Sequence, residues 1–170
     1  MREVMRPSLA ERTTLRLGGT AIAELVLEDA ADLAALPERL RALGGSPLIL
    51  GAGSNILARD GDLPLVLLRP RFMRGPEIAG EKDGKILVRV GAGVPLPRLL
   101  RFCAGQGLSG LEGLVGIPGS VGGAVAMNAG SFGTETCKNI ESIQIVSNEA
   151  VRRVTVDALQ YGYRRLSISE

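Results

Sequence analysis

The sequence contains no histidine and no tryptophan among its 170 residues. Without histidine the commonest general base is missing, and with it the Ser-His-Asp and Cys-His arrangements of many hydrolases. The two cysteines, Cys103 and Cys137, form no Cys-x-x-Cys pair. Because zinc sites in proteins are built mainly from histidine and paired cysteine, no metal site is expected.

Excess charge and long apolar runs are also absent from the sequence. Lys and Arg number 20 and Asp and Glu number 18, which gives a net charge of +2. A balance so close to zero does not suggest a nucleic-acid partner. No apolar run approaches the roughly 18 residues of a membrane-spanning helix, and the N-terminus lacks the apolar centre of a signal peptide. We expect a cytoplasmic monomer that binds neither nucleic acid nor membrane.

What the chain has in quantity is glycine and aliphatic residues. It contains 23 glycines, its apolar fraction is 45%, and its aromatic fraction is only 3%, so the core must be aliphatic. Seven of the glycines fall in the uncharged segment Gly113–Gly133. Glycine exposes backbone N–H groups and allows positive φ, and both properties suit close approach to a ligand. The first hypothesis for this central segment is therefore a cradle for a phosphate-bearing cofactor.

The order of the predicted elements favours an α+β fold rather than a doubly wound sheet. In the first part of the chain we expect two short strands within residues 13–28, a helix over 30–43 that Pro37 kinks or splits, and buried strands at 47–50 and 63–68. In the second part we expect a loop over 74–85, a strand at 86–90, a helix over 95–106, a hairpin of 140–147 and 151–156 across Asn148-Glu149, and a short helix from Asp157. Strands and helices do not alternate as strictly as a doubly wound sheet requires.

Two glycine motifs are candidates for the phosphate site. The first, Gly51-Ala-Gly-Ser-Asn55, follows a predicted strand and begins like the dinucleotide motif G-x-G-x-x-G. Ile56 stands where the third glycine belongs, and residues 58–64 cannot form the long helix that this motif requires, so a Rossmann fold is not predicted. The second motif, in the central segment, lacks the lysine of a P-loop.

Both motifs nevertheless combine glycine with short polar side chains, namely Ser54, Asn55, Ser120 and Asn128. Backbone N–H groups in such turns can bind a pyrophosphate without help from Lys or Arg. The alternative is structural, because glycines in both places also allow strands to cross closely. The residue pattern leaves a phosphate-binding α+β protein and this packing role both open.

Four segments of the chain resemble the family of UDP-N-acetylenolpyruvylglucosamine reductases: Leu50–Leu57, Gly110–Gly123, Met127–Gly130 and Gly162–Arg164. The resemblance implies an α+β FAD-binding domain of the vanillyl-alcohol-oxidase (PCMH) type, not a Rossmann fold. Its two subdomains would be residues 1–68, with the pyrophosphate turn, and residues 69–170, with a wall for the flavin. The family's substrate-binding region follows the position of Glu170, so we expect it to be absent from this chain.

The resemblance also implies which residues hold the cofactor, a non-covalently bound FAD. The pyrophosphate would lie on the first glycine turn, which consists of Gly51, Ala52, Gly53, Ser54 and Asn55. The flavin and its ribityl chain would lie against a wall formed by Ile117, Gly119, Ser120, Val121, Gly123, Asn128, Ala129 and Gly130. The central segment would then serve the flavin ring rather than the phosphates.

In the family's reaction, NADPH is the co-substrate that reduces the flavin, and the enolpyruvyl group of the UDP-sugar then receives the hydride. The product is UDP-N-acetylmuramate, a peptidoglycan precursor. Arg164 matches the arginine that stabilises the enolate, and Tyr163 beside it would contact the substrate. Without the resemblance, Arg164 is interpreted as a surface charge and Tyr163 as core packing.

Two other functions remain open beside this one. The chain could belong to a flavin-dependent oxidase of the same superfamily, which uses oxygen in place of NADPH. It could also be a non-catalytic module that binds FAD or another ligand. Since the family's substrate-binding region is expected to be missing, we expect the chain alone to lack turnover.

Overall fold

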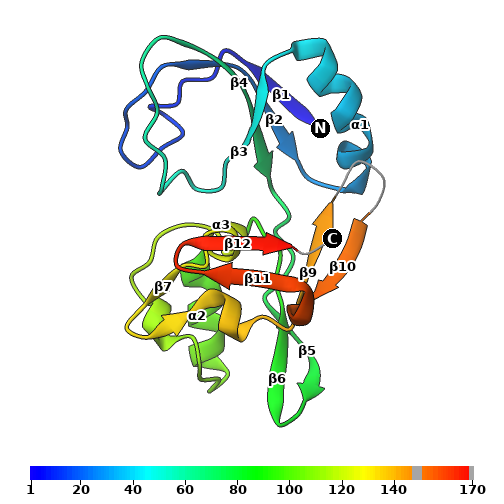
Figure 1. The fold of residues 1–170 in the computed structure, drawn as a ribbon, viewed down its shortest axis with the longest axis vertical. Helices are drawn as coiled ribbons and strands as arrows, with labels where there is room; N and C mark the ends of the chain where they lie inside the picture. Colours follow the sequence, from blue (N-terminus) through cyan, green and yellow to red (C-terminus); the bar gives the residue numbers. More distant parts are fainter. Residues whose placement is uncertain (147–150, 169–170) are drawn as a thin grey trace. The chain divides into compact units, whose positions relative to one another are not determined.

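The computed structural model describes residues 1–146 and 151–168, which form two compact units, Met1–Phe72 and Met73–Glu170 (Figure 1). The subdomain boundary predicted between residues 68 and 69 falls inside strand β4 (Asp62–Pro70). Among the described residues, no helix is long and apolar enough to cross a membrane. The same residues include no group of three or more side chains placed to hold a metal ion.

The first unit is a four-stranded sheet with one helix. Its elements are β1 (Arg2–Met5), β2 (Thr20–Leu27), α1 (Ala30–Leu43), β3 (Ser46–Ile49) and β4. The strand order is β1-β2-β4-β3, with β4 parallel to both β2 and β3 and with β1 antiparallel to β2. The carboxyl ends of the three parallel strands therefore meet at one edge of the sheet, which is the usual ligand edge of open α/β sheets.

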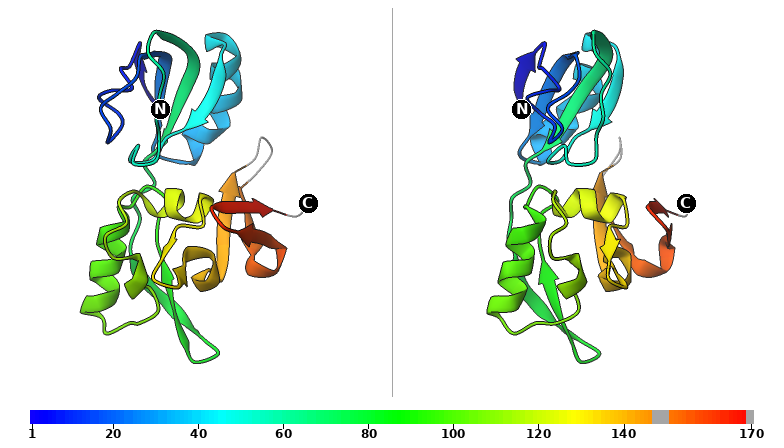
Figure 2. Two further views of the ribbon diagram at one scale, coloured as in Figure 1. Left: turned by 60° about the vertical axis from the view of Figure 1, so that its left-hand side comes forward. Right: turned by 90° about the vertical axis from the view of Figure 1, so that its left-hand side faces the viewer.

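Helix α1 covers one face of this sheet (Figures 1 and 2). It begins after Asp29, whose carboxylate accepts the N–H of Asp32 at 3.0 Å in a capping box, and it ends at Gly44 with φ 66°. The bounds predicted for this helix are confirmed, but Pro37 lies inside it without splitting it. Four leucines of the helix, Leu33, Leu36, Leu40 and Leu43, pack on buried residues of β2 and β4.

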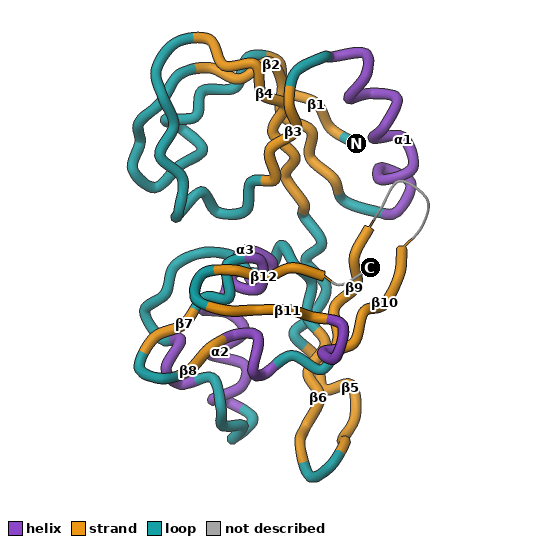
Figure 3. Tube along the Cα trace, in the orientation of Figure 1, coloured by secondary structure: helices purple, strands orange, loops and turns teal. Residues whose placement is uncertain are grey.

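Two long loops, residues 6–19 and 50–61, cover the opposite face of the sheet (Figure 3). Leu9 from the first loop and Leu50 from the second are buried there with Leu67 of β4. The loops also bond to each other, since the N–H of Gly19 donates to the carbonyl of Arg59 at 2.8 Å. The strand predicted before Gly18 does not form, because this segment is a turn held by those loop contacts.

The connection from β3 to β4 differs from the one that the dinucleotide motif requires. Residues 50–61 join two parallel strands without forming a helix, whereas a βαβ unit places a helix there. The first glycine motif therefore opens a loop instead of a helix. The prediction that this is not a Rossmann fold is confirmed.

The second unit is built from short hairpins around two helices. Its elements are β5 (Glu77–Lys82), β6 (Lys85–Arg89), α2 (Leu96–Gly105), α3 (Val121–Ala126), β7 (Gly130–Ser131), β8 (Thr134–Glu135), β9 (Ser142–Val146), β10 (Val151–Thr155), β11 (Leu159–Gly162) and β12 (Arg165–Ile168). Its aliphatic core contains Leu96 and Leu99 of α2, Leu114, and Val121 and Ala124 of α3. The mixture of strands and helices in both units agrees with the predicted α+β class.

Three predictions for the second unit meet different outcomes. The hairpin of β9 and β10 is confirmed, and its predicted turn at Asn148-Glu149 lies outside the described residues. The predicted loop over 74–85 is wrong, because β5 and β6 pair as a hairpin across Asp83-Gly84. The predicted helix from Asp157 is also wrong, since only the 3₁₀ turn Val156–Ala158 forms before the β11–β12 hairpin.

Candidate functional site

The first glycine motif forms an exposed turn at the carboxyl edge of the parallel strands. Leu50 is buried, and its N–H donates to the carbonyl of Leu68 at 2.8 Å, which fixes the start of the turn to β4. Gly51, Ala52 and Asn55 are exposed, while Gly53 is buried with φ 70°. The five residues predicted to hold the pyrophosphate thus lie together in one turn.

Gly53 is the point at which this turn rests on the rest of the unit. The N–H of Thr14 donates to the carbonyl of Gly53 at 3.1 Å. A Cβ built on Gly53 would lie 2.1 Å from the carbonyl oxygen of Arg12, which no side chain can tolerate. Residues 12–14, which we call the platform, therefore lie directly against the turn, and only glycine fits at position 53.

The donors in the turn fit a diphosphate. The backbone N–H groups of Gly51, Ala52 and Asn55 donate no hydrogen bond to any residue within 1–146 or 151–168. Unpaired N–H groups on exposed residues of one turn suit an anion, and FAD presents one in its pyrophosphate. The residues present therefore fit the phosphate part of FAD.

Several guanidinium groups lie near Arg69 in the first unit. Burial lowers the pKa of the Arg69 guanidinium, and the neighbouring Arg71, Arg12 and Arg2 lower it further, against the attraction of Glu24. Four guanidinium groups thus share one region of the first unit. A negatively charged ligand bound on this unit reduces their mutual repulsion.

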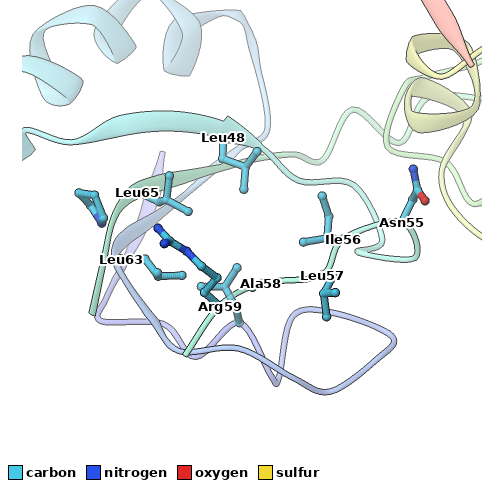
Figure 4. Close-up of a pocket in the computed structure, with 10 residues that line it drawn as sticks. Leu48, Asn55, Ile56, Leu57, Ala58, Arg59, Leu63 and Leu65 are labelled. Atoms are coloured by element: carbon cyan, nitrogen blue, oxygen red, sulfur yellow. The ribbon is translucent and has the colours of Figure 1, made fainter. Parts of the chain in front are cut away.

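A pocket of about 460 Å³ adjoins the turn on the face of the sheet away from α1 (Figure 4). Its walls are mostly aliphatic, and it is lined by Leu9, Leu48, Asn55, Ile56, Leu57, Ala58, Arg59, Leu63, Pro64 and Leu65. The Arg59 side chain extends from the loop toward β4 (Figure 4). Asn55 belongs both to the turn and to the pocket lining, so a ligand held by the turn has an apolar surface beside it.

In the second unit, the central segment contains a short helix rather than only a loop. Ser120 caps α3, with its Oγ 3.3 Å from the N–H of Gly123. The N–H of Val121 donates to Val94 and the N–H of Gly122 to Ala92, at 2.9 and 2.8 Å. A Cβ on Gly122 would lie 2.8 Å from that of Ala92. Internal packing thus accounts for this glycine.

The residues predicted to form the flavin wall differ in exposure. Gly123 is exposed, Ile117, Gly119 and Gly130 are partly exposed, and Ser120, Val121, Asn128 and Ala129 are buried. Gly119 has φ 127°, which side chains rarely adopt. A Cβ on Gly130 would lie 2.7 Å from the carbonyl oxygen of Thr134 in the paired strand. Of the residues expected to form the flavin wall, only those that are partly or fully exposed can contact the flavin directly.

Asn128 serves the structure of the second unit through its whole side chain. Its Nδ2 donates to Glu135 Oε2 at 2.9 Å and to the carbonyl of Gly162 at 3.0 Å, and its Oδ1 accepts the N–H of Cys137 at 3.0 Å. The residue is 3% exposed and has φ 40°. It links the end of α3 to the hairpin that carries Arg164.

Arg164 lies in the turn between β11 and β12, with φ 56°. Its Cζ is 5.4 Å from the centroid of the Tyr163 ring, a cation–π distance. Tyr163 is 91% exposed, so the core-packing interpretation of this residue is wrong. No acidic residue within the described ranges pairs with Arg164. Its guanidinium is thus available to an anionic ligand.

The sequence analysis missed a buried ion-pair network beneath the turn. Glu24 in β2 is 4% exposed and contacts Arg12 and Arg69. The signal that could have revealed it is the single charged residue in the otherwise apolar run of β2, Thr20–Leu27. A carboxylate in such a strand requires charged partners.

A family model and several known proteins match this chain. The family model described as an FAD binding domain matches residues 22–154. UDP-N-acetylenolpyruvoylglucosamine reductase from Nitratidesulfovibrio vulgaris is 53% identical over 95% of this chain, and that from Oleidesulfovibrio alaskensis is 56% identical over 83%. A crystal structure of UDP-N-acetylenolpyruvylglucosamine reductase from Thermus caldophilus matches 97% of the chain with a TM-score of 0.74 and 36% identity.

These alignments cover only part of each relative. They span 55% and 48% of the two curated sequences and 56% of the crystallised chain, so the chain has about half the length of the proteins it matches. The family model, by contrast, covers most of the chain, and it includes the glycine turn and the central segment. The chain belongs to the FAD-binding domain family.

Proposed function

We propose that the chain binds FAD non-covalently and forms the FAD-binding part of a UDP-N-acetylenolpyruvoylglucosamine reductase. With a substrate-binding region like that of its longer relatives, it would reduce UDP-N-acetylglucosamine enolpyruvate to UDP-N-acetylmuramate with NADPH as co-substrate. The observation that carries the proposal is the turn Gly51–Asn55 at the carboxyl edge of a parallel sheet, in which the N–H groups of Gly51, Ala52 and Asn55 donate to no residue in the described part of the chain.

In this proposal the first unit holds the adenosine diphosphate part of FAD. The N–H groups of Gly51, Ala52 and Asn55 bind the pyrophosphate, and the nearby guanidinium groups offset its charge. The aliphatic pocket beside Asn55 would receive the adenine ring, which a ribose joins to that pyrophosphate. Its volume of about 460 Å³ lies within the range of small-molecule sites.

The second unit supplies the flavin wall and a cation for the substrate. The exposed backbone of Gly119 and Gly123 would lie against the isoalloxazine ring, since a glycine lets a flat ring approach. The bound flavin supplies the hydride chemistry. Arg164 would bind the carboxylate of the enolpyruvyl group and stabilise the negative charge that develops beside it, because a guanidinium stays charged when desolvated.

Titration of the purified chain with FAD tests the binding proposal. We expect quenching of flavin fluorescence that saturates at one FAD per chain. Asn55→Asp adds a negative charge at the exposed turn and should weaken FAD binding by about fivefold or more, because one unit charge near a phosphate changes the energy by at least about 1 kcal/mol. Gln144→Glu makes the same charge change in β9 and is the matched control. A folded chain that does not bind FAD refutes the proposal.

Reconstitution with the C-terminal region of a relative tests the proposed reaction. The chain is mixed with, or fused to, the C-terminal region of the Nitratidesulfovibrio vulgaris relative, and NADPH oxidation is followed with and without the enolpyruvyl UDP-sugar. Oxidation that depends on this substrate supports the reductase. Oxygen consumption that needs no NADPH would support the oxidase alternative, and FAD binding without either activity would support a non-catalytic module.

A further inference from the structure

Glu24 is a buried carboxylate on the face of the first sheet opposite α1. It is 4% exposed and pairs in register with Leu67, which packs with Leu9 and Leu50 under the two long loops. Placing an ionised carboxylate in such surroundings is unfavourable unless it is paired and hydrogen-bonded. The residues that pair with Glu24 therefore indicate the role of its carboxylate.

Arg12 is the better-oriented of the two partners. Its Nε donates to Glu24 Oε2 at 3.1 Å, and its Nη2 lies 3.1 Å from the same oxygen. Arg69 Nε lies 2.7 Å from Glu24 Oε1, but this buried nitrogen makes no aligned hydrogen bond within the described part of the chain. Arg12 Nη1 also donates to Oε2 of the exposed Glu11 at 2.8 Å. Glu24 is thus the buried one of the two carboxylates that orient the Arg12 side chain, and it balances the charge of Arg69.

The backbone of Arg12 lies directly beneath the glycine turn. Its carbonyl oxygen occupies the space where a Cβ on Gly53 would lie, and the N–H of Thr14 donates to the carbonyl of Gly53. Thr13 between them is buried, and its Oγ1 donates to the carbonyl of Leu9 at 2.9 Å. A continuous series of contacts therefore runs from Glu24 through Arg12 to the turn.

We propose that Glu24 is a positioning residue for FAD: through Arg12 it fixes the platform of residues 12–14, so that the Gly51–Asn55 turn keeps the shape that binds the pyrophosphate. The inference rests on the proposed function of this turn. Glu24 does not touch the ligand, and it lies among several arginines. Positioning and simple electrostatics therefore predict opposite effects when its charge is removed.

Glu24→Gln distinguishes the two effects, because it keeps the size of the side chain and removes its negative charge. If only the local field mattered, the additional net positive charge would tighten FAD binding. If Glu24 positions the platform, FAD binding should weaken by about tenfold or more, as is typical when a residue behind a ligand site is lost. Binding that stays unchanged or becomes tighter overturns the proposal.

Glu3→Gln is the matched control in the same sheet. Glu3 in β1 pairs with Leu25 on the other face, and its carboxylate accepts from Arg39 of α1 at 2.5 and 2.6 Å. The substitution removes one carboxylate from an Arg–Glu pair of the same unit, away from the turn. It should leave FAD affinity within about twofold of the wild type.

Amide hydrogen exchange gives a readout that does not depend on FAD. In the ligand-free chain, Glu24→Gln should speed exchange of the Thr14 N–H, which bonds to Gly53, by about tenfold, and Glu3→Gln should not. If the wild type binds no FAD, the proposed function fails, and this exchange rate still decides whether Glu24 fixes the platform. Equal exchange in the wild type and Glu24→Gln overturns the inference.

Arg12→Lys provides a second variant should Glu24→Gln fail to fold. It keeps the positive charge and the backbone but replaces the planar guanidinium fork by a single ammonium. We expect weaker FAD binding, by about tenfold, with an unchanged far-UV circular dichroism spectrum. A folded Arg12→Lys chain that binds FAD as tightly as the wild type refutes the positioning role.

Discussion

The side-chain amide of Asn128 donates a hydrogen bond to the backbone carbonyl of Gly162, 3.0 Å away, although 34 residues separate them in the sequence. Asn128 lies two residues after the end of α3, and Gly162 ends β11, two residues before Arg164. One amide therefore sets where the β11–β12 turn lies on the second unit. The bond also assigns Asn128, expected at the flavin wall, a structural function that requires no ligand.

Asn128→Ala should lower the free energy of unfolding by about 3 kcal/mol, because it leaves the buried N–H of Cys137 and the carbonyl of Gly162 without their partner. Denaturant titration measures the loss. Asn128→Gly keeps the backbone free to adopt φ 40° and separates that contribution from the hydrogen bonds. Asn139→Ala, which removes one exposed hydrogen bond to the carbonyl of Glu135, should cost less than about 1 kcal/mol. Equal losses at positions 128 and 139 would contradict this account.

Gly53→Ala should weaken FAD binding by more than about tenfold, because the new methyl group meets the Arg12 carbonyl and forces the turn away from its platform. Isothermal titration with FAD measures the change. Gly84→Ala is the control for backbone strain alone, since Gly84 has φ 73°, close to the 70° of Gly53, and open space at the Cβ position. Similar affinities of the two variants would show that the shape of the turn does not matter for FAD.

Glu135 should make the stability of the second unit sensitive to acid. A hydrogen bond with Lys138, and a second from Asn128, lower the pKa of Glu135 below the ordinary value of 4.5. A carboxyl with a depressed pKa in the folded state stabilises the fold above its unfolded pKa, and this contribution disappears as the pH falls through the folded pKa.

The wild type should therefore exceed Glu135→Gln in stability at pH 7, and the difference should shrink as the pH falls below 4.5 and through the lower pKa of the folded state. Thermal unfolding at a series of pH values follows it. Lys138→Gln, which removes the first partner of the carboxylate, should reduce the pH-dependent difference. A difference that is constant across this range would rule out the contribution of the charge.

Arg164→Ala should leave FAD binding unchanged and slow hydride transfer to the enolpyruvyl substrate when the chain is combined with the C-terminal region of a relative. Removal of a single cation that stabilises developing charge typically costs about 100-fold to 1,000-fold in rate. Stopped-flow oxidation of the reduced flavin by the substrate measures the step. Arg165→Ala, one residue further on and also exposed, is the control. Equal rates in the two variants would remove Arg164 from the role proposed for it.

Elements with local signals could be predicted from the sequence. The bounds of α1 follow from the Asp29 cap, the leucine spacing and Gly44-Gly45. Strand β5 could not be predicted by hydrophobic alternation, because nearly all of its side chains are exposed and it has no apolar face. Asp83-Gly84 was the signal for that hairpin, since both residues adopt the positive φ of a tight turn.

Elements that depend on distant contacts could not be predicted. Asp157 resembles a helix cap, but the following residues form β11 because they pair with β12 and bond to Asn128. For the site, the glycine motif indicated the turn that we propose for the pyrophosphate, whereas the contacts of Arg12 with Glu24 beneath it depend on side chains that the fold brings together. Short motifs thus indicate where a ligand binds better than they indicate what holds the site in shape.

The packing of Gly53 on Arg12 has a consequence for how such chains diverge. The absence of a side chain at Gly53 is demanded by the protein backbone itself, since the obstructing atom is a carbonyl oxygen of residue 12. A descendant that lost its cofactor would still need this glycine in order to fold. Loss of the ligand would first become visible at the exposed positions Gly51 and Ala52, where mutations are not opposed by the packing of Gly53. Gly53 is therefore retained because the packing of the fold requires it, whereas Gly51 and Ala52 would be retained only for the proposed ligand.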